Sequence, residues 1–180
     1  TLSKTKEEFK PLREGKVGLY TCGPTVYAFA HIGNFRAYVF EDLLRRVLEY
    51  DNFKVTHIMN ITDIDDKTIR ESIKTNMNLI DYTQKYIKAF HEDVKRLSLL
   101  PAHHYPKATD FIDKMIDLIK TLEEKGFTYT TEDGSVFFKI SKFKNYGLLS
   151  GIDSAQLLAG ERVETDEYDK EEARDFALWK

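Results

Sequence analysis

The chain has 180 residues, a formal net charge of −3, 42% hydrophobic residues, 32% charged residues and one cysteine. This length buries one real core with at most a small second lobe, and the composition is that of an ordinary soluble protein. The near-neutral charge argues against a basic nucleic-acid clamp, and the single cysteine excludes an internal disulfide framework. No apolar run approaches the ~20 residues that span a bilayer, and no signal segment is visible at the start. We expect a cytoplasmic protein without membrane contact.

The stretch 19–34, LYTCGPTVYAFAHIGN, contains the candidate phosphate-binding residues on which the other predictions depend. A short apolar strand is predicted over 17–21; it ends at Cys22 and a Gly-Pro break, and His31-Ile32-Gly33-Asn34 follows directly before a helix pattern. An α/β protein holds a phosphate where a strand breaks at glycine and re-enters a helix, because the helix N-terminus offers free N–H groups and partial positive charge. Gly33 allows close backbone approach there, and His31 and Asn34 supply side-chain donors.

A strand–helix–strand unit follows from the next pattern. Apolar residues recur at three and four positions and predict one helix face, formed by Ala37, Phe40, Leu44, Val47 and Leu48. The segment 54–61, KVTHIMNI, alternates and is rich in β-branched residues, so it predicts a second strand. This order implies a right-handed βαβ unit with a parallel sheet, whose ligands gather at the carboxyl ends of the strands. Cys22 and Thr62 are therefore expected on one rim.

The remainder of the chain is predicted as further helices and a hairpin. Aromatic and aliphatic residues at near-fourfold spacing predict an amphipathic helix over 81–97, where Tyr82, Tyr86 and Phe90 serve packing rather than base stacking. Prolines at 101 and 106 mark the best domain boundary. A helix is predicted over 111–122 with Gly126 at its end, then a hairpin around 132–134. The acidic segment 161–175 is expected to be a solvated arm, and Trp179 to lie in a core.

The motif CGPTVY at 22–27, followed by HIGN at 31–34, resembles the signature of cysteinyl-tRNA synthetases, a family of class I aminoacyl-tRNA synthetases. NITDIDDK at 60–67 and DFALWK at 175–180 fit the same family. The resemblance covers nearly the whole chain, which has less than half of the family's usual length. It implies an α/β fold with a Rossmann-like parallel-sheet half at 1–100, a smaller α+β connective insertion at 101–172, and a truncated return to the catalytic domain at 173–180.

The resemblance assigns the nucleotide site to five residues. His31 and Asn34, which replaces the last histidine of the HIGH motif, would hydrogen-bond ATP phosphates in the transition state and form the catalytic pair. Gly33 would leave room for the adenine, and Gly23 and Thr25 would complete the ATP site. From the residues alone, His31 is also consistent with a polar loop residue and Asn34 with a helix N-cap.

For cysteine recognition the resemblance implies two residues. Cys22 would be the first ligand of a zinc ion that binds the thiolate of the substrate, and Thr62 would line the cysteine pocket. Zinc needs at least three protein ligands. The family's remaining ligands lie downstream of DFALWK, so we predict that this chain alone does not hold zinc tightly. A small buried residue for Cys22 and a helix cap for Thr62 remain the alternatives.

Two polar clusters have simpler interpretations. Asp63, Asp65 and Asp66 could suggest a magnesium site, but acids at a helix start with structural partners are the favoured interpretation. The adjacent His103 and His104 have no third ligand nearby and are predicted to lie in a surface loop.

The implied function is cysteine–tRNA ligase: ATP-dependent formation of cysteinyl-adenylate and transfer to tRNA(Cys), with Mg²⁺ accompanying ATP. The partners would be ATP, L-cysteine and tRNA(Cys), acting on a monomer. The family's KMSKS motif is absent, so the isolated chain is expected to be inactive or nearly so. Two alternatives stay open: a cysteine ligase of mycothiol synthesis that uses cysteinyl-adenylate, and a non-catalytic nucleotide- or protein-binding module.

Overall fold

The computed structural model describes residues 3–151 and 175–180. The chain divides into two compact units: an N-terminal unit, Phe9–Ile112, and a C-terminal unit, which joins Thr1–Glu8 to Asp113–Lys180. None of the described helices combines the length and apolarity that crossing a membrane would require.

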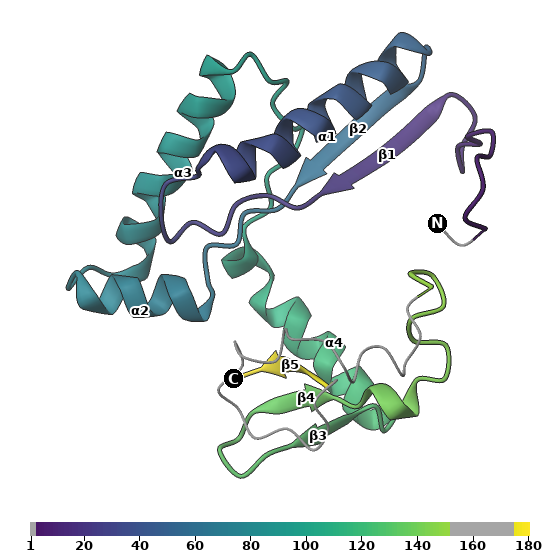
Figure 1. The fold of residues 1–180 in the computed structure, drawn as a ribbon. Coiled ribbons are helices and arrows are strands. Elements are labelled where there is room, and N and C mark those ends of the chain that lie inside the picture. The colour runs from purple at the N-terminus through teal and green to yellow at the C-terminus, as the bar shows by residue number, and fades with distance from the viewer. Residues whose placement is uncertain (1–2, 152–174) are drawn as a thin grey trace. The chain divides into compact units, whose positions relative to one another are not determined.

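The N-terminal unit is built on a parallel βαβ motif, as the sequence predicts. Strands β1 (Lys16–Thr21) and β2 (Lys54–Met59) pair in parallel, with Lys16 opposite Lys54 and Thr21 opposite Met59. Helix α1 (Ile32–Tyr50) connects the two strands and runs along them in Figure 1. Because the strands are parallel, their carboxyl ends lie at the same edge of the sheet.

Helices α2 (Asp66–Lys74) and α3 (Leu79–Arg96) complete the N-terminal unit. The main core cluster joins α1, β2 and α3 through its buried members Phe35, Tyr38, Met59, Phe90, Val94 and Ala102. Tyr82 and Phe90 of α3 are buried, and Tyr86 is partly buried against a second core cluster, so the predicted packing role of the three residues is confirmed. Leu97, the last residue of the predicted helix, follows α3 and is 49% exposed.

The predicted apolar face of α1 is wrong. Phe35, Tyr38 and Arg45 are the buried residues of this helix, whereas Phe40 is 65% and Val47 48% exposed. The helix carries apolar residues on more than one side, so periodicity alone does not choose which side the sheet and α3 cover. Tertiary contacts choose the side that bears Phe35 and Tyr38.

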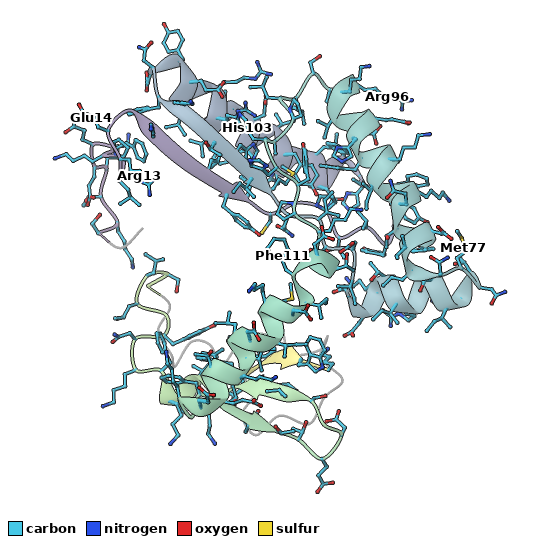
Figure 2. All side chains as sticks on the ribbon, turned by 180° about the vertical axis from the view of Figure 1, so that it is seen from behind. Arg13, Glu14, Met77, Arg96, His103 and Phe111 are labelled. Atoms are coloured by element: carbon cyan, nitrogen blue, oxygen red, sulfur yellow. The ribbon has the colours of Figure 1, made fainter. Side chains whose placement is uncertain are left out.

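The segment after α3 lies along β2. His57 O accepts a hydrogen bond from the backbone N–H of His103 at 2.8 Å, and Met59 N–H donates to His104 O at 3.1 Å. The His103 ring also takes part, since its Nδ1 accepts from His57 N–H at 2.9 Å (Figure 2). The two histidines are exposed and lie outside the named strands, so the predicted surface loop is confirmed. An isolated bridge between Ile58 and His104 attaches this loop to β2, a contact that the sequence did not predict.

The C-terminal unit contains helix α4 (Ile112–Glu124) and a three-stranded antiparallel sheet in the order β3 (Thr128–Thr130), β4 (Val136–Phe138), β5 (Phe176–Trp179). A short 3₁₀ helix covers Ile140–Lys142 of this unit, and another, Ala108–Phe111, belongs to the N-terminal unit. The predicted hairpin is confirmed as β3–β4, and Gly126 has the positive φ of 71° expected after a helix end.

Strand β5 pairs with β4 and so belongs to this smaller sheet in the described part of the chain. Trp179 is 38% exposed, which corrects its predicted place in a core, whereas Phe137 of β4 is fully buried. Apart from Asp175, the predicted acidic arm lies outside the described residues. The assignment of 1–100, 101–172 and 173–180 to parts of a catalytic domain stays a prediction.

Candidate functional site

A pocket of about 330 Å³ lies at the carboxyl end of β1. It is lined by residues 23–25 and 27–31 of the loop before α1, by Asn34 and Tyr38 of α1, and by Lys67 of α2. Four residues predicted for the ATP site therefore share one cavity: Gly23, Thr25, His31 and Asn34. Cys22, Gly33 and Thr62 are not among its lining residues.

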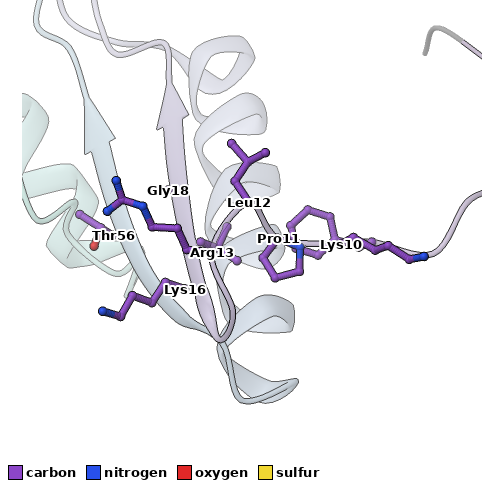
Figure 3. Close-up of a pocket in the computed structure, with 9 residues that line it drawn as sticks. Lys10, Pro11, Leu12, Arg13, Lys16, Gly18 and Thr56 are labelled. Atoms are coloured by element: carbon purple, nitrogen blue, oxygen red, sulfur yellow. The ribbon is translucent and has the colours of Figure 1, made fainter.

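Two other hollows of the N-terminal unit contain fewer of the predicted residues. Gly33 lines one on α1, together with Arg36, Ala37 and Phe40. The other, of about 520 Å³, lies between the N-terminal segment and the strands β1 and β2, and it holds none of the predicted site residues (Figure 3).

Gly23 joins the end of β1 to the end of β2. A Cβ at this position would lie 1.8 Å from the carbonyl oxygen of Asn60, so only glycine fits without moving the backbone. The N–H of Gly23 donates to Asn60 Oδ1 at 3.2 Å. This close approach holds the loop that begins the pocket.

The N-terminus of α1 is closed by a capping box made of two predicted site residues. His31 is the N-cap, and its Nδ1 accepts from Gly33 N–H at 3.0 Å. Asn34 is the third helical residue, and its Oδ1 accepts from His31 N–H at 3.0 Å. The prediction of Asn34 as the N-cap is therefore wrong by three residues, because the imidazole takes the capping role.

This capping box fixes which polar atoms remain for a ligand. With Nδ1 of His31 acting as acceptor, the ring proton resides on Nε2, and with Oδ1 of Asn34 engaged, the amide NH₂ remains. The first turn of α1 carries no acidic side chain, so the positive end of the helix dipole is not neutralised there. A ligand in the pocket therefore meets hydrogen-bond donors, which suits an anion.

Gly33 has a local structural role beside the one the resemblance implies. A Cβ at Gly33 would lie 2.8 Å from Cε1 of His31, so glycine is what allows the imidazole to fold back onto its own helix. Whether Gly33 also leaves room for adenine stays a prediction.

Thr62 lies beside the loop that forms the pocket. Its backbone exchanges hydrogen bonds with that loop, from Val26 N–H at 3.1 Å and to Pro24 O at 3.0 Å. Its hydroxyl oxygen accepts from Asn60 Nδ2 at 3.0 Å, so the hydroxyl proton is left to donate elsewhere. Thr62 does not cap α2, because Asp65 is the N-cap there.

Sequence reasoning missed Asn60 as a positioning residue. Its side-chain oxygen accepts from Gly23 N–H and from Tyr20 Oη, both at 3.2 Å, while its NH₂ orients Thr62. The available signal was a polar amide directly after a predicted strand, two residues before Thr62 in the motif.

Replacing Asn60 with alanine is expected to lower the free energy of unfolding by about 2 kcal/mol, because Gly23 N–H and the Thr62 hydroxyl lose a partly buried partner. Denaturant titration measures this loss. The matched variant Asn60→Asp keeps the acceptor for Gly23 but cannot donate to Thr62, so we expect it to lose less. An Asn60→Ala protein as stable as the wild type would show that the hydrogen bonds of the Asn60 side chain contribute nothing to stability.

Cys22 is exposed, which overturns its interpretation as a small buried residue. Its link to the pocket is Tyr38, which lines the cavity. Burial raises the pKa of Tyr38 to about 12, with further contributions from the charges of Glu41 and Cys22. Tyr38 lines the same pocket as His31 and Asn34.

The acidic residues after β2 have structural partners. Asp63 accepts hydrogen bonds from the backbone N–H of Thr109 at 3.0 Å and from its hydroxyl at 2.7 Å. Asp65 accepts from Lys67 N–H at 2.8 Å and caps α2. The predicted structural partners are therefore confirmed for these two carboxylates.

The residues present do not complete a zinc site. Within 3–151 and 175–180, no group of three or more histidine, cysteine, aspartate or glutamate side chains could hold a metal ion. The exposed thiol of Cys22 fits a single ligand position, whereas zinc in proteins has at least three protein ligands.

A buried histidine lies beneath the same rim. His57 Nε2 lies 2.9 Å from Thr21 Oγ1, and burial lowers the pKa of His57, with Arg45 and His103 adding to this effect and Asp42 opposing it. The folded protein therefore disfavours the charged imidazole. Because the folded pKa of His57 lies below the unfolded value of 6.5, its contribution to stability is fully present above pH 6.5 and is lost as the pH falls through the folded pKa.

We therefore expect the free energy of unfolding to decrease as the pH is lowered from about 6.5 towards 5. Over this range His57 is protonated more readily in the unfolded chain than in the folded protein. The variant His57→Gln should have a shallower dependence over this range. Denaturant titrations at several pH values measure both curves, and equal slopes would contradict the prediction.

Comparison with known proteins adds to this geometry. A family model described as the catalytic domain of class I (C) tRNA synthetases matches residues 8–180. A curated relative from Brachyspira hyodysenteriae, named cysteine–tRNA ligase, is 54% identical over 100% of this chain and 38% of its own length. Relatives of the same name from Protochlamydia amoebophila and Leptospira interrogans are 50% and 52% identical over the same shares. The chain thus spans little more than a third of the length of these relatives.

Solved structures share the fold. Methionyl-tRNA synthetase of Mycobacterium tuberculosis, in complex with methionyl-adenylate, matches with a TM-score of 0.61 at 14% identity, over 80% of this chain and 34% of that one. A LeuRS–tRNA–LeuAMS complex from Agrobacterium radiobacter K84 matches with a TM-score of 0.57 at 19% identity, over 71% and 18%. These likenesses establish the Rossmann-like α/β fold.

Proposed function

The chain belongs to the family of class I (C) tRNA synthetase catalytic domains, and from this premise we propose that it forms the N-terminal part of the active site of a cysteine–tRNA ligase. The reaction would activate L-cysteine with ATP and Mg²⁺ to cysteinyl-adenylate and then transfer the cysteine to tRNA(Cys). The names of the relatives do not favour a mycothiol-pathway ligase.

The capping box of α1 carries this proposal. It engages Nδ1 of His31 and Oδ1 of Asn34 and leaves the Nε2 proton and the amide protons as donors on the pocket that both residues line. In adenylate formation the cysteine carboxylate attacks the α-phosphorus of ATP and pyrophosphate leaves. Negative charge builds up on the phosphate oxygens in the transition state. Hydrogen-bond donors fixed beside these oxygens therefore stabilise the transition state, and no acid or base is needed.

The amino acid would lie towards the other side of the rim. The hydroxyl oxygen of Thr62 accepts from Asn60 Nδ2, which leaves the hydroxyl proton to donate, and the thiol of Cys22 is exposed. Zinc, if bound, would supply a soft Lewis acid for the substrate thiolate. Cys22 would be one ligand, and the others would come from outside the described residues.

The zinc content of the purified chain tests whether Cys22 is its single zinc ligand. The purified 180-residue chain is expected to contain well under one zinc per chain, because one thiolate is too few ligands. Elemental analysis after dialysis measures it, with Cys22→Ala as the control. Stoichiometric zinc that disappears in Cys22→Ala would contradict the prediction.

We also propose that the protein is monomeric and cytoplasmic. The exposed thiol of Cys22 would stay reduced in that compartment. Its catalytic half would span 1–100, its connective insertion 101–172 and its return to the catalytic domain 173–180. The isolated chain would catalyse little.

The decisive experiment joins residues 1–180 to the remaining part of the Brachyspira hyodysenteriae relative, giving a protein of the relatives' length, here called the joined protein. We expect cysteine-dependent exchange of pyrophosphate into ATP, then charging of tRNA(Cys). Serine in place of cysteine is the control. Exchange that does not depend on cysteine, or a well-folded joined protein without exchange, would overturn the proposal.

A further inference from the structure

Lys67 adds a positive charge to the pocket that contains His31 and Asn34. It is the second residue of α2, and its ammonium group lies 5.2 Å from the ring centre of Tyr27; both residues line the pocket. The described lining includes no carboxylate, and the other cation-forming side chain on it is His31. The charge balance of the cavity therefore favours an anion.

The ammonium group of Lys67 is available to a ligand. Two nearby carboxylates are engaged elsewhere: Asp65 accepts the backbone N–H of Lys67 and caps α2, and Asp63 accepts from Thr109. The ion pairs formed within the described ranges do not include Lys67. Its observed partner is an aromatic ring, whose attraction for an exposed cation is weaker than a charge-assisted hydrogen bond to a phosphate oxygen.

We propose that Lys67 is a phosphate-binding residue of this site, which leaves the Tyr27 ring and binds a phosphate oxygen of the nucleoside triphosphate. The assignment rests on the proposed function, which supplies the nucleotide. A lysine suits the task, because its ammonium is a compact charge with three donors on a flexible stem and can follow a ligand into the pocket. Without a nucleotide, the ammonium group of Lys67 lies over the Tyr27 ring.

The chain offers a matched control. Lys85 lies over aromatic rings at nearly the same distances, 5.3 Å from the centre of Phe29 and 5.2 Å from that of Tyr86, but it does not line the pocket. Lys67→Met and Lys85→Met therefore remove the same charge and the same type of ring contact, and they differ in access to the cavity.

The test titrates the 180-residue chain with millimolar Mg–ATP and, separately, with adenosine, followed by NMR. We expect Lys67→Met to weaken ATP affinity about tenfold, the loss of one charge-assisted contact, and to leave adenosine affinity unchanged. Lys67→Arg should stay close to the wild type, and Lys85→Met should match the wild type for both ligands. All variants should share one unfolding temperature, since Lys67 is exposed.

The outcomes separate this inference from the function on which it rests. A wild-type chain that binds neither ATP nor adenosine overturns the nucleotide site and the Lys67 assignment with it. Wild-type binding of ATP with unchanged affinity in Lys67→Met overturns the assignment alone. In the joined protein, Lys67→Met should slow pyrophosphate exchange, which needs no tRNA; normal exchange with slowed transfer to tRNA would assign the lysine to RNA and overturn its role at the nucleotide.

Discussion

Replacing Gly23 with alanine is expected to lower the free energy of unfolding of the N-terminal unit by about 3 kcal/mol or more. The added Cβ would lie 1.8 Å from the carbonyl oxygen of Asn60 and 2.9 Å from Cγ of Met59. A backbone oxygen cannot turn away as a flexible side chain can, so the ends of β1 and β2 must separate. This also breaks the hydrogen bond from Gly23 N–H to Asn60 and so deforms the pocket. Chemical denaturation measures the loss.

Gly18 provides the control for this prediction. It lies in the middle of β1, and a Cβ there would meet no atom within 4 Å. Gly18→Ala should change stability by no more than about 0.5 kcal/mol in either direction. Equal destabilisation by the two substitutions would show that the loss reflects glycine chemistry in general and not the contact with Asn60.

Replacing His31 with alanine is expected to lower the rate of cysteinyl-adenylate formation in the joined protein by about 10² to 10³-fold, the usual effect of removing one donor that stabilises transition-state charge. The same change removes the N-cap of α1, which costs about 1 kcal/mol of stability. Pyrophosphate exchange measures the rate, and denaturation measures the cap.

The variant His31→Ser separates these two effects. A serine hydroxyl accepts a hydrogen bond at an N-cap as well as any side chain does, but it cannot reach into the pocket as imidazole does. We expect wild-type stability with exchange as slow as in His31→Ala. Recovery of exchange along with stability would mean that His31 acts on the reaction solely by ordering the helix, and the proposed donor role would fail.

Exchange in Asn34→Asp would test the second donor. A carboxylate can still accept from His31 N–H and complete the capping box, but it offers no proton to a phosphate and adds negative charge beside it. The helix start should therefore survive while the site loses its match to an anion. This contrast follows from the capping box, which the HIGN letters alone do not reveal.

Much of the fold could be predicted from local pattern. The alternation in 54–61 and the three-and-four spacing after Asn34 predicted β2 and α1, and their order predicted the parallel sheet with Cys22 and Thr62 at one rim. The hairpin around Gly134 was equally local. These features were accessible because hydrophobic period and turn chemistry act over a few residues.

The sequence by itself determined the βαβ unit, the motif residues and the family to which they belong. Only the tertiary structure decided that Phe35 and Tyr38, not Phe40 and Val47, face the core, that His31 rather than Asn34 caps α1, and that Lys67 meets Tyr27, which lies far from it in the chain. The physical reason is that a periodic pattern states how a segment folds, whereas the partner of a side chain depends on which distant elements the sheet brings beside it.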